Sequence, residues 1–558
     1  MRGAPQRRLL VVGIVVALLA AACGGGGPGP QKSTGGIVAG GIFRLGTDSG
    51  PDTLNPFTAG ATDSWTLFLY MYPALIVYDG DLKISPSFAT DWSTSEDGLT
   101  WTFHTQPDAK WSDGEPLTAE DVAWNFNTIL KFGDGPTAAL APLLSHSTGA
   151  EAPDPNTVLV HYDQPVANVL PQLQEIPILP EHVWGPLAQG DGKAIRLYSN
   201  VPENGKPFVC GGPFVLTRYE EDAIALFERN PNFYGPEPHI DGFGLQTFSN
   251  DDAMVQALLN HEIDGVEIVP PTSIDVVQKA GFVVEDVPGL QVYYLAINSN
   301  PDKTTNRELL DPAVRKAFEY ATDRTQMNEV AFLGHAESAG SVISPTTGTW
   351  FDTNIQPLPF DIAKANQVLD QAGYPVGPDG IRVANGHEMK YELIFPKWMG
   401  GPGDRQFQIL KASLMQIGVE ITQVVLDTSA AWDAIIAPNG KYLTYDLTMG
   451  QWQPYVDPDF MLSVFLCSQY GNWNDSGYCN PGYDRLYAEQ GTTMDLKERQ
   501  QLVWQMQEML YNDHPYINFD YPDWIEAHSP EWDGFVMGPQ GSFNEMSNLT
   551  MISIHKVA

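Results

Sequence analysis

The sequence of 558 residues contains few side-chain patterns that could carry out a reaction. It has no Gly-x-Ser-x-Gly nucleophile elbow and no Walker phosphate loop. His261-Glu262 and His387-Glu388 lack the second histidine of a His-Glu-x-x-His zinc motif. Aspartates and glutamates are numerous enough to form a glycosidase-like pair, but no pair is singled out. We therefore predict that the chain is not an enzyme, and we expect no cofactor and no metal site.

Cys23 is the first residue whose position suggests a chemical modification. A basic N-terminal stretch and an uncharged apolar run, residues 9–22, precede it, and the run ends in Ala20-Ala21-Ala22. Because a membrane-spanning helix needs about 20 apolar residues, this run fits a signal peptide better. The pattern resembles the bacterial lipobox, which predicts a signal peptide over 1–22 and lipidation of Cys23. An ordinary signal peptide with an incidental cysteine is the alternative. The Gly-rich residues 23–40 would then form a tether.

The other three cysteines allow one disulfide. Cys467 and Cys479 lie 12 positions apart in a stretch rich in Gly, Asn and Asp, and exported proteins meet oxidising conditions. Metal ligation is the alternative, but a second Cys/His pair at zinc spacing is missing. We favour the disulfide, which would contribute about 3 kcal/mol in the chain-entropy model. Cys210 is then left as a buried thiol.

Charge argues against several partners. The precursor has 30 basic and 68 acidic residues. Without the leader and its three arginines, 27 basic and 68 acidic residues remain, a net charge of −41. Such a surface repels phosphate backbones, so we expect no nucleic-acid partner.

Aromatic residues are abundant, with 14 Trp and 22 Tyr. Trp65, Trp398 and Trp452 stand in polar or Gly/Pro-rich contexts, where an amphipathic ring suits a wet recognition pocket. A place in the core is the equally weighted alternative for each.

Helix and strand signals are mixed along the chain. Alternation over residues 99–104 and the runs at 157–162, 292–298 and 419–426 predict strands. Thr118 with Asp121 predicts a capping box, and Asp311 and Asp361 predict helix N-caps. The pattern indicates a mixed α/β fold of two or three domains.

Five segments carry recognisable sequence blocks, which include LLDPAVRKAFEYATDRTQM and QWQPYVDPDF. The segments are Thr53–Phe126, Cys210–Gly235, Leu309–Met327, Phe360–Tyr374 and Gln451–Phe460. Together, and in this order, they resemble the extracellular solute-binding protein family 5 of ABC importers, which includes the dipeptide- and oligopeptide-binding proteins.

The resemblance implies a periplasmic-binding-protein-like clamp of two lobes and three domains. Its predicted domains are domain I (41–67, 195–290 and 528–558), domain II (68–194) and domain III (291–527). Chain crossings near 290 and 527 would form the hinge, and closure would bury a solute between the lobes. We expect a monomer that delivers its solute to an ABC permease.

Candidate ligand contacts follow from position within the family motifs and from the aromatic residues in polar contexts. The predicted ligand-binding residues are Ala61, Thr62, Asp63, Trp65, Tyr293, Tyr294, Trp398, Trp452 and Gln453.

One expected contact is absent. In the family's peptide binders an Asp just before the Asp-Pro element pairs with the peptide's α-amino group, but Pro454 occupies that position here. Asp457 is expected to cap a helix rather than to replace it.

Peptides are the leading ligand that the resemblance implies. An oligosaccharide is the alternative within the family, because sugars stack on aromatic rings and need no counter-charge, and nickel complexes rank last because no His cluster stands out. A secreted hydrolase is the alternative from another class. The predicted location is the extracellular or periplasmic face of the cell membrane, held by the lipid on Cys23.

Overall fold

The computed structural model describes residues 36–203, 209–436, 443–544 and 546–558. The predicted signal peptide, Cys23 and most of the predicted tether lie outside the described residues. Within the described ranges, no helix combines the length and the apolar character that a membrane crossing requires.

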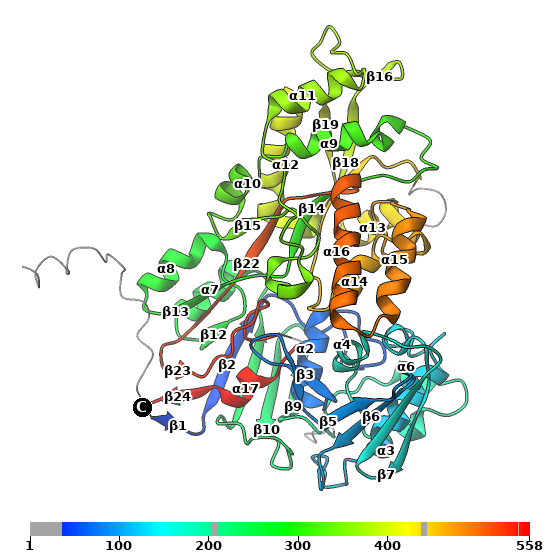
Figure 1. Cartoon of the computed structure of the whole chain (residues 1–558). Coiled ribbons are helices and arrows are strands. Elements are labelled where there is room, and N and C mark those ends of the chain that lie inside the picture. Colours follow the sequence, from blue (N-terminus) through cyan, green and yellow to red (C-terminus); the bar gives the residue numbers. More distant parts are fainter. Residues whose placement is uncertain (1–35, 204–208, 437–442, 545) are drawn as a thin grey trace, which may run out of the picture.

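The first sheet has eight strands that come from distant parts of the chain. Its order is β13-β22-β12-β2-β11-β10-β9, and β15 pairs with β22. The strands are β2 (Ile42–Thr47), β9 (Phe214–Glu220), β10 (Ile224–Arg229), β11 (Gly242–Thr247), β12 (Gly265–Val266), β13 (Val283–Pro288), β15 (Ala336–Ser338) and β22 (Asp520–His528). The helices beside this sheet are α2 (Thr62–Met71), α7 (Asp251–Leu259) and α8 (Ile274–Lys279) (Figure 1).

A second sheet of four antiparallel strands has the order β5-β6-β8-β7. The strands are β5 (Ala89–Thr94), β6 (Thr100–Thr105), β7 (Ser147–Asp154) and β8 (Thr157–Tyr162). In β6, Trp101 and Phe103 are buried while His104 is exposed, which confirms the predicted alternation. The capping box of Thr118 and Asp121 at α3 (Ala119–Lys131) is also confirmed.

The third sheet has the order β19-β18-β20-β14-β21. Its strands are β14 (Val292–Ile297), β18 (Lys390–Pro396), β19 (Glu420–Leu426), β20 (Leu447–Trp452) and β21 (Tyr516–Asn518). The helices around it are α9 (Pro312–Tyr320), α10 (Arg324–Ala331), α11 (Ile362–Gln371), α12 (Gly400–Gln416), α13 (Thr428–Ile436), α14 (Asp459–Ser463), α15 (Pro481–Thr492) and α16 (Leu496–Asp513). The predicted N-caps Asp311 and Asp361 accept backbone N–H bonds at α9 and α11.

The chain forms two lobes (Figure 1), and each lobe has its own hydrophobic clusters. One continuous cluster joins the first and second sheets, with Phe43 and Phe243 beside the first and Phe103 and Phe126 beside the second. These parts form the first lobe, residues 36–290 and 529–558. The main clusters around the third sheet lie in the second lobe, residues 291–519. The predicted mixed α/β clamp is therefore the observed fold.

Two neighbouring chain segments connect the lobes. One leads from β13 to β14 through Gly289, and the other is β22, residues 520–528. A Cβ on Gly289 would lie 2.3 Å from the carbonyl oxygen of Pro522, so only glycine allows the two segments to approach this closely. The predicted boundary at 527 falls inside β22. The first residues of this strand, 520–522, pair with β15 of the second lobe, and residues 523–528 pair with β13 of the first lobe.

The predicted disulfide between Cys467 and Cys479 is present, with Cα atoms 4.5 Å apart. Cys210 is fully buried in the cluster of the first lobe, as expected. Burial raises the pKa of its thiol to about 12, which keeps the sulfur protonated and unreactive at neutral pH.

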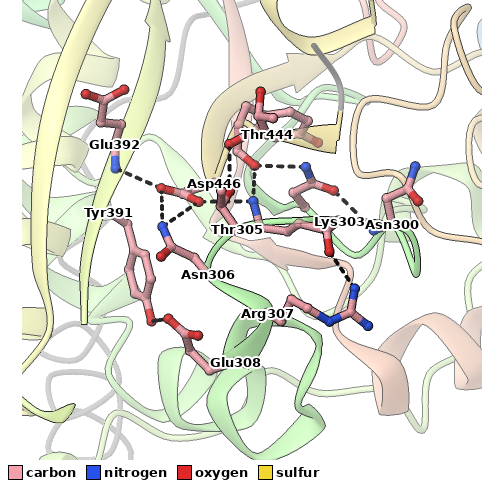
Figure 2. Close-up of polar contacts among 12 residues, drawn as sticks. Asn300, Lys303, Thr305, Asn306, Arg307, Glu308, Tyr391, Glu392, Thr444 and Asp446 are labelled. Carbon is pink, nitrogen blue, oxygen red and sulfur yellow. Dashed lines mark hydrogen bonds and ion pairs between the residues drawn. The ribbon is translucent and has the colours of Figure 1, made fainter. Parts of the chain in front are cut away.

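A buried ion pair holds two chain segments of the second lobe together (Figure 2). Lys303, which has no solvent exposure, places its Nζ 3.0 Å from Oδ1 of Asp446. The Asp446 carboxylate also accepts two hydrogen bonds from Asn306 Nδ2, each of 2.9 Å. Because the Lys303 ammonium and the carboxylate are both satisfied, this network ties the segment after β14 to β20 without leaving a buried charge unpaired.

Asp520, at the start of β22, gives the stability a predictable pH dependence. Burial raises its pKa from 3.8 to about 7. Between pH 3.8 and about 7, this carboxyl group is ionised in the unfolded chain but protonated in the folded protein. The contribution of Asp520 to the stability therefore falls by about 1.4 kcal/mol per pH unit as the pH rises through this window, and this contribution is constant above it.

The variant Asp520→Asn should lose this dependence and keep the bond from Gln406 Nε2. We expect it to gain stability over the wild type when denaturant midpoints are compared at pH 8 and pH 4. An equal difference at the two pH values would contradict the assignment.

Candidate functional site

Two cavities lie between the lobes. We call the first the apolar cavity; it has a volume of about 630 Å³, and its walls include Trp65, Phe68 and Leu69 of the first lobe and Phe460 and Trp473 of the second. The second, the acidic cavity, has a volume of about 540 Å³. Its walls include Asp48, Asp63 and Glu267 of the first lobe and Trp398 and Gln453 of the second. A ligand in either cavity would contact both lobes.

The first turns of α2 separate the two cavities. Trp65 faces the apolar cavity, whereas Thr62 and Asp63 line the acidic one. The turn is anchored by Asp52, whose carboxylate accepts hydrogen bonds from Gly60 N–H (2.9 Å) and from Ser64 Oγ (2.6 Å). The predicted cleft segment is thus held rigidly, with its side chains divided between the two cavities.

Ala61 is the N-cap residue of α2 and lines neither cavity. Its backbone N–H is 3.3 Å from Asp52 Oδ1. Ala61 therefore belongs to the turn that begins α2 and does not form part of either cavity wall.

Tyr293 and Tyr294 point to opposite sides of β14, as alternate residues of a strand must. Tyr293 lines the acidic cavity. Tyr294 is buried, stacks on Tyr516 with ring centroids 4.0 Å apart, and donates a 2.6 Å hydrogen bond to Asp475. Tyr294 is thus a core residue in this structure.

Trp452 lies behind the wall of the apolar cavity. It is 8% exposed, and its Nε1 donates a 3.0 Å hydrogen bond to Tyr516. Its ring centroid lies 5.7 Å from that of Phe460 and 6.1 Å from that of Trp473. Phe460 and Trp473, which the sequence did not single out, form the wall itself. Of the two roles considered for Trp452, the geometry fits the core.

Trp398 and Gln453 both line the acidic cavity. Trp398, in the 3-10 turn Lys397–Met399, is 36% exposed and available for stacking. Gln453 Oε1 accepts a 3.1 Å hydrogen bond from Gln291 Nε2, which joins the end of β20 to the chain segment between the lobes.

Asp457 is committed to an ion pair. Its two carboxylate oxygens receive Nη1 and Nη2 of Arg499 at 2.7 and 2.8 Å, and Oδ1 also accepts the N–H of Asp459 at 3.0 Å. The helix α14 begins at Asp459, one residue later than expected, with Pro458 as its N-cap residue. The prediction that Asp457 is the N-cap residue is therefore wrong by one position. The carboxylate instead pairs with Arg499, 42 residues away, which no local pattern indicates.

Acidic side chains outnumber basic ones in the wall of the acidic cavity. Burial raises the pKa of Asp63, and repulsion from Asp48 and Asp52 raises it further. Burial also raises the pKa of Glu267 well above its usual range, with repulsion from Asp63 and Asp48 in the same direction. Thr47 Oγ1 donates a hydrogen bond to Glu267. Within the described part of the chain, no basic side chain pairs with these two carboxyl groups, so a positively charged ligand group would stabilise their ionised forms.

One group of side chains could hold a metal ion. Asp286, His335 and Asp523 each offer a ligand atom, and these atoms lie within 4.8 Å of one another. His335 Nδ1 is 2.7 Å from Asp286 Oδ2, so the imidazole already has a polar partner beside the connecting segments. The three side chains therefore link β13 and β22 of the first sheet to the second lobe.

A two-lobed α/β protein with cavities between its lobes has the architecture of a solute-binding protein that closes on its ligand. Residues 83–473 match the family described as bacterial extracellular solute-binding proteins, family 5 Middle. The chain belongs to this family of ABC-transporter solute-binding proteins, and it is a transport protein, not an enzyme.

Several relatives match along most of their length. Protein XP55 of Streptomyces lividans is 27% identical over 521 residues, which cover 92% of this chain and 89% of the relative. A probable D,D-dipeptide-binding periplasmic protein of Escherichia coli is 25% identical, with coverages of 89% and 91%. The fold matches the periplasmic binding protein DppA from Helicobacter pylori, solved with the peptide STSA, with a TM-score of 0.75, 22% identity and coverages of 93% and 99%.

Proposed function

We propose that the protein captures peptides between its lobes and delivers them to the permease of an ABC importer. The observation that carries the proposal is the pair of cavities on the two sides of α2, each lined by both lobes. Bound peptide would bridge the lobes and favour the closed form by its contacts to both. The rings of the apolar cavity suit apolar side chains, and the polar groups of the acidic cavity suit a peptide end. Relatives named as peptide binders support this ligand class.

An oligosaccharide is the second candidate. Trp65, Phe460 and Trp473 present aromatic surfaces in the apolar cavity, as sugar stacking requires. Sugars carry no charge, however, and would leave the carboxylates of the acidic cavity without a counter-charge.

A thermal-shift screen separates the two ligand classes. A ligand at about 100 times its Kd should stabilise the folded protein by about 2.7 kcal/mol. We expect di- to pentapeptides to raise the melting temperature and α- and β-linked oligosaccharides to leave it unchanged. A shift with sugars alone would reject the peptide proposal.

We also propose that a lipid on Cys23 holds the protein at the outer face of the membrane. The basic stretch, the short apolar run and the alanines before this cysteine support the proposal. Replacing Cys23 with serine should move the protein from the membrane fraction to the soluble fraction, as measured by fractionation and immunoblotting. Unchanged membrane association of Cys23→Ser would count against lipidation.

A further inference from the structure

The acidic cavity has more acidic than basic side chains in its wall. Five carboxylate side chains line it, against one arginine and one histidine: Asp48, Asp63, Asp251, Glu267 and Asp523, with Arg405 and His335. The imidazole faces Asp286, and Arg405 donates to the carbonyl of Ala331 at 3.0 Å. Among the described residues, neither of these side chains pairs with the first-lobe acids in the cavity wall, so these acids remain available to a ligand.

Gln540 adds an observation that is independent of charge. Its side chain is 2% exposed and lines the same cavity, yet neither Nε2 nor Oε1 has a hydrogen-bond partner within the described residues. Gln451 Oε1, also on the wall of the acidic cavity, lacks a partner too. Buried amides without partners cost free energy, and a ligand that supplies a donor or an acceptor removes this cost.

The position of Gln540 is fixed by its turn. Gly538 and Gly541 exchange two backbone hydrogen bonds of 3.0 Å around it. Gly541 has φ +79°, and a Cβ there would lie 1.8 Å from Glu526 Oε1, so only glycine fits. Ser542 donates its N–H to the same carboxylate oxygen at 2.8 Å. A rigid turn thus presents an unsatisfied amide to the acidic cavity.

We propose that the acidic cavity binds the cationic amino group of the transported ligand, through the carboxylates of Asp63 and Glu267 and the side-chain amide of Gln540. This inference rests on the proposed function and names the ligand group and the lobe that recognises it. The second lobe has Pro454 at the position where the family resemblance places an aspartate, so the first lobe supplies the negative charge instead. Ligands with a free amino terminus are then selected over blocked ones.

The test compares one mixed library of tri- to pentapeptides with free amino termini and the same library after N-acetylation. Binding to the full-length protein is followed by calorimetry and by native mass spectrometry. A hydrogen-bonded charge contributes about 1.5–3 kcal/mol, so acetylation should weaken binding by about tenfold or more. Asp63→Asn and Glu267→Gln should each weaken binding of the free library similarly and remove most of the difference between the two libraries.

Asp252→Asn is the matched control, because Asp252 is an exposed acid on α7 outside both cavities. It should bind both libraries as the wild type does. The melting temperature without ligand monitors folding, and we expect Asp63→Asn to keep it or raise it, because the change removes repulsion. If Asp63→Asn fails to fold, Gln540→Ala gives the same comparison.

The outcomes separate the two proposals. Binding of free and acetylated peptides with equal affinity, by the wild type and by the Asp63→Asn and Glu267→Gln variants, would overturn this inference and leave peptide capture intact. Absence of binding of either library to the wild type would overturn peptide capture, and this inference with it.

Discussion

Replacing Trp452 with alanine should lower the free energy of unfolding by about 3–5 kcal/mol, the usual cost of removing a large aromatic side chain from a core. The ring is 8% exposed and packs against Phe460 and Trp473, and its Nε1 is the donor to Tyr516. Its loss leaves a void behind the wall of the apolar cavity. Denaturant unfolding of the protein without ligand measures the effect.

Trp398→Ala is the matched control. This side chain is 36% exposed on the wall of the acidic cavity, so its loss should change stability by about 0.5 kcal/mol or less. Its effect should appear in ligand affinity. A Trp452→Ala variant as stable as the wild type would show that the ring is not part of the core.

Arg499→Met should be as destabilising, by about 3–5 kcal/mol, because it leaves buried carboxylates without a counter-charge. The guanidinium makes two hydrogen bonds to Asp457, one to Gln490 Oε1 at 2.9 Å, and lies over the ring of Trp350 at 4.8 Å. Burial and the charge of Asp457 raise the pKa of Asp459, so loss of the arginine adds to an existing strain between acids. Thermal and denaturant unfolding measure the change.

Arg218→Met provides the comparison. Arg218 pairs with Glu220 at the surface, where both side chains are more than half exposed. Exposed ion pairs contribute about 0–1 kcal/mol. An Arg499→Met variant that matches Arg218→Met in stability would contradict the structural role assigned to the buried pair.

Local features of the fold were predictable from the sequence because their causes lie within a few residues. The caps at Thr118, Asp311 and Asp361 are set by side chains beside the helix start. The disulfide between Cys467 and Cys479 needed only spacing and composition. Family resemblance supplied the two-lobed arrangement, which no local pattern determines.

The site was only partly predictable, since its neighbours come from distant segments. Trp398 and Trp452 have similarly polar surroundings in the sequence, yet one lines a cavity and the other lies behind a wall. Alternation along β14 could have separated Tyr293 from Tyr294, because only one face of that strand meets the acidic cavity. Gln540 gave no signal, because only the folded turn shows that its amide lacks partners.

The acids that we propose in place of the missing aspartate were not predictable for the same reason. The sequence shows that Pro454 cannot bind an amino group, but it does not show which acids replace the missing one. Asp63 and Glu267 are 204 positions apart and meet only because α2 and the segment after β12 border one cavity.

Native mass spectrometry of the freshly purified protein tests peptide capture most directly, because a closed clamp retains part of its ligand. Gentle ionisation should show adducts that, once released and fragmented, yield amino-acid sequences with free amino termini. Adducts that fragment into sugar units, with no peptide among them, would contradict the account.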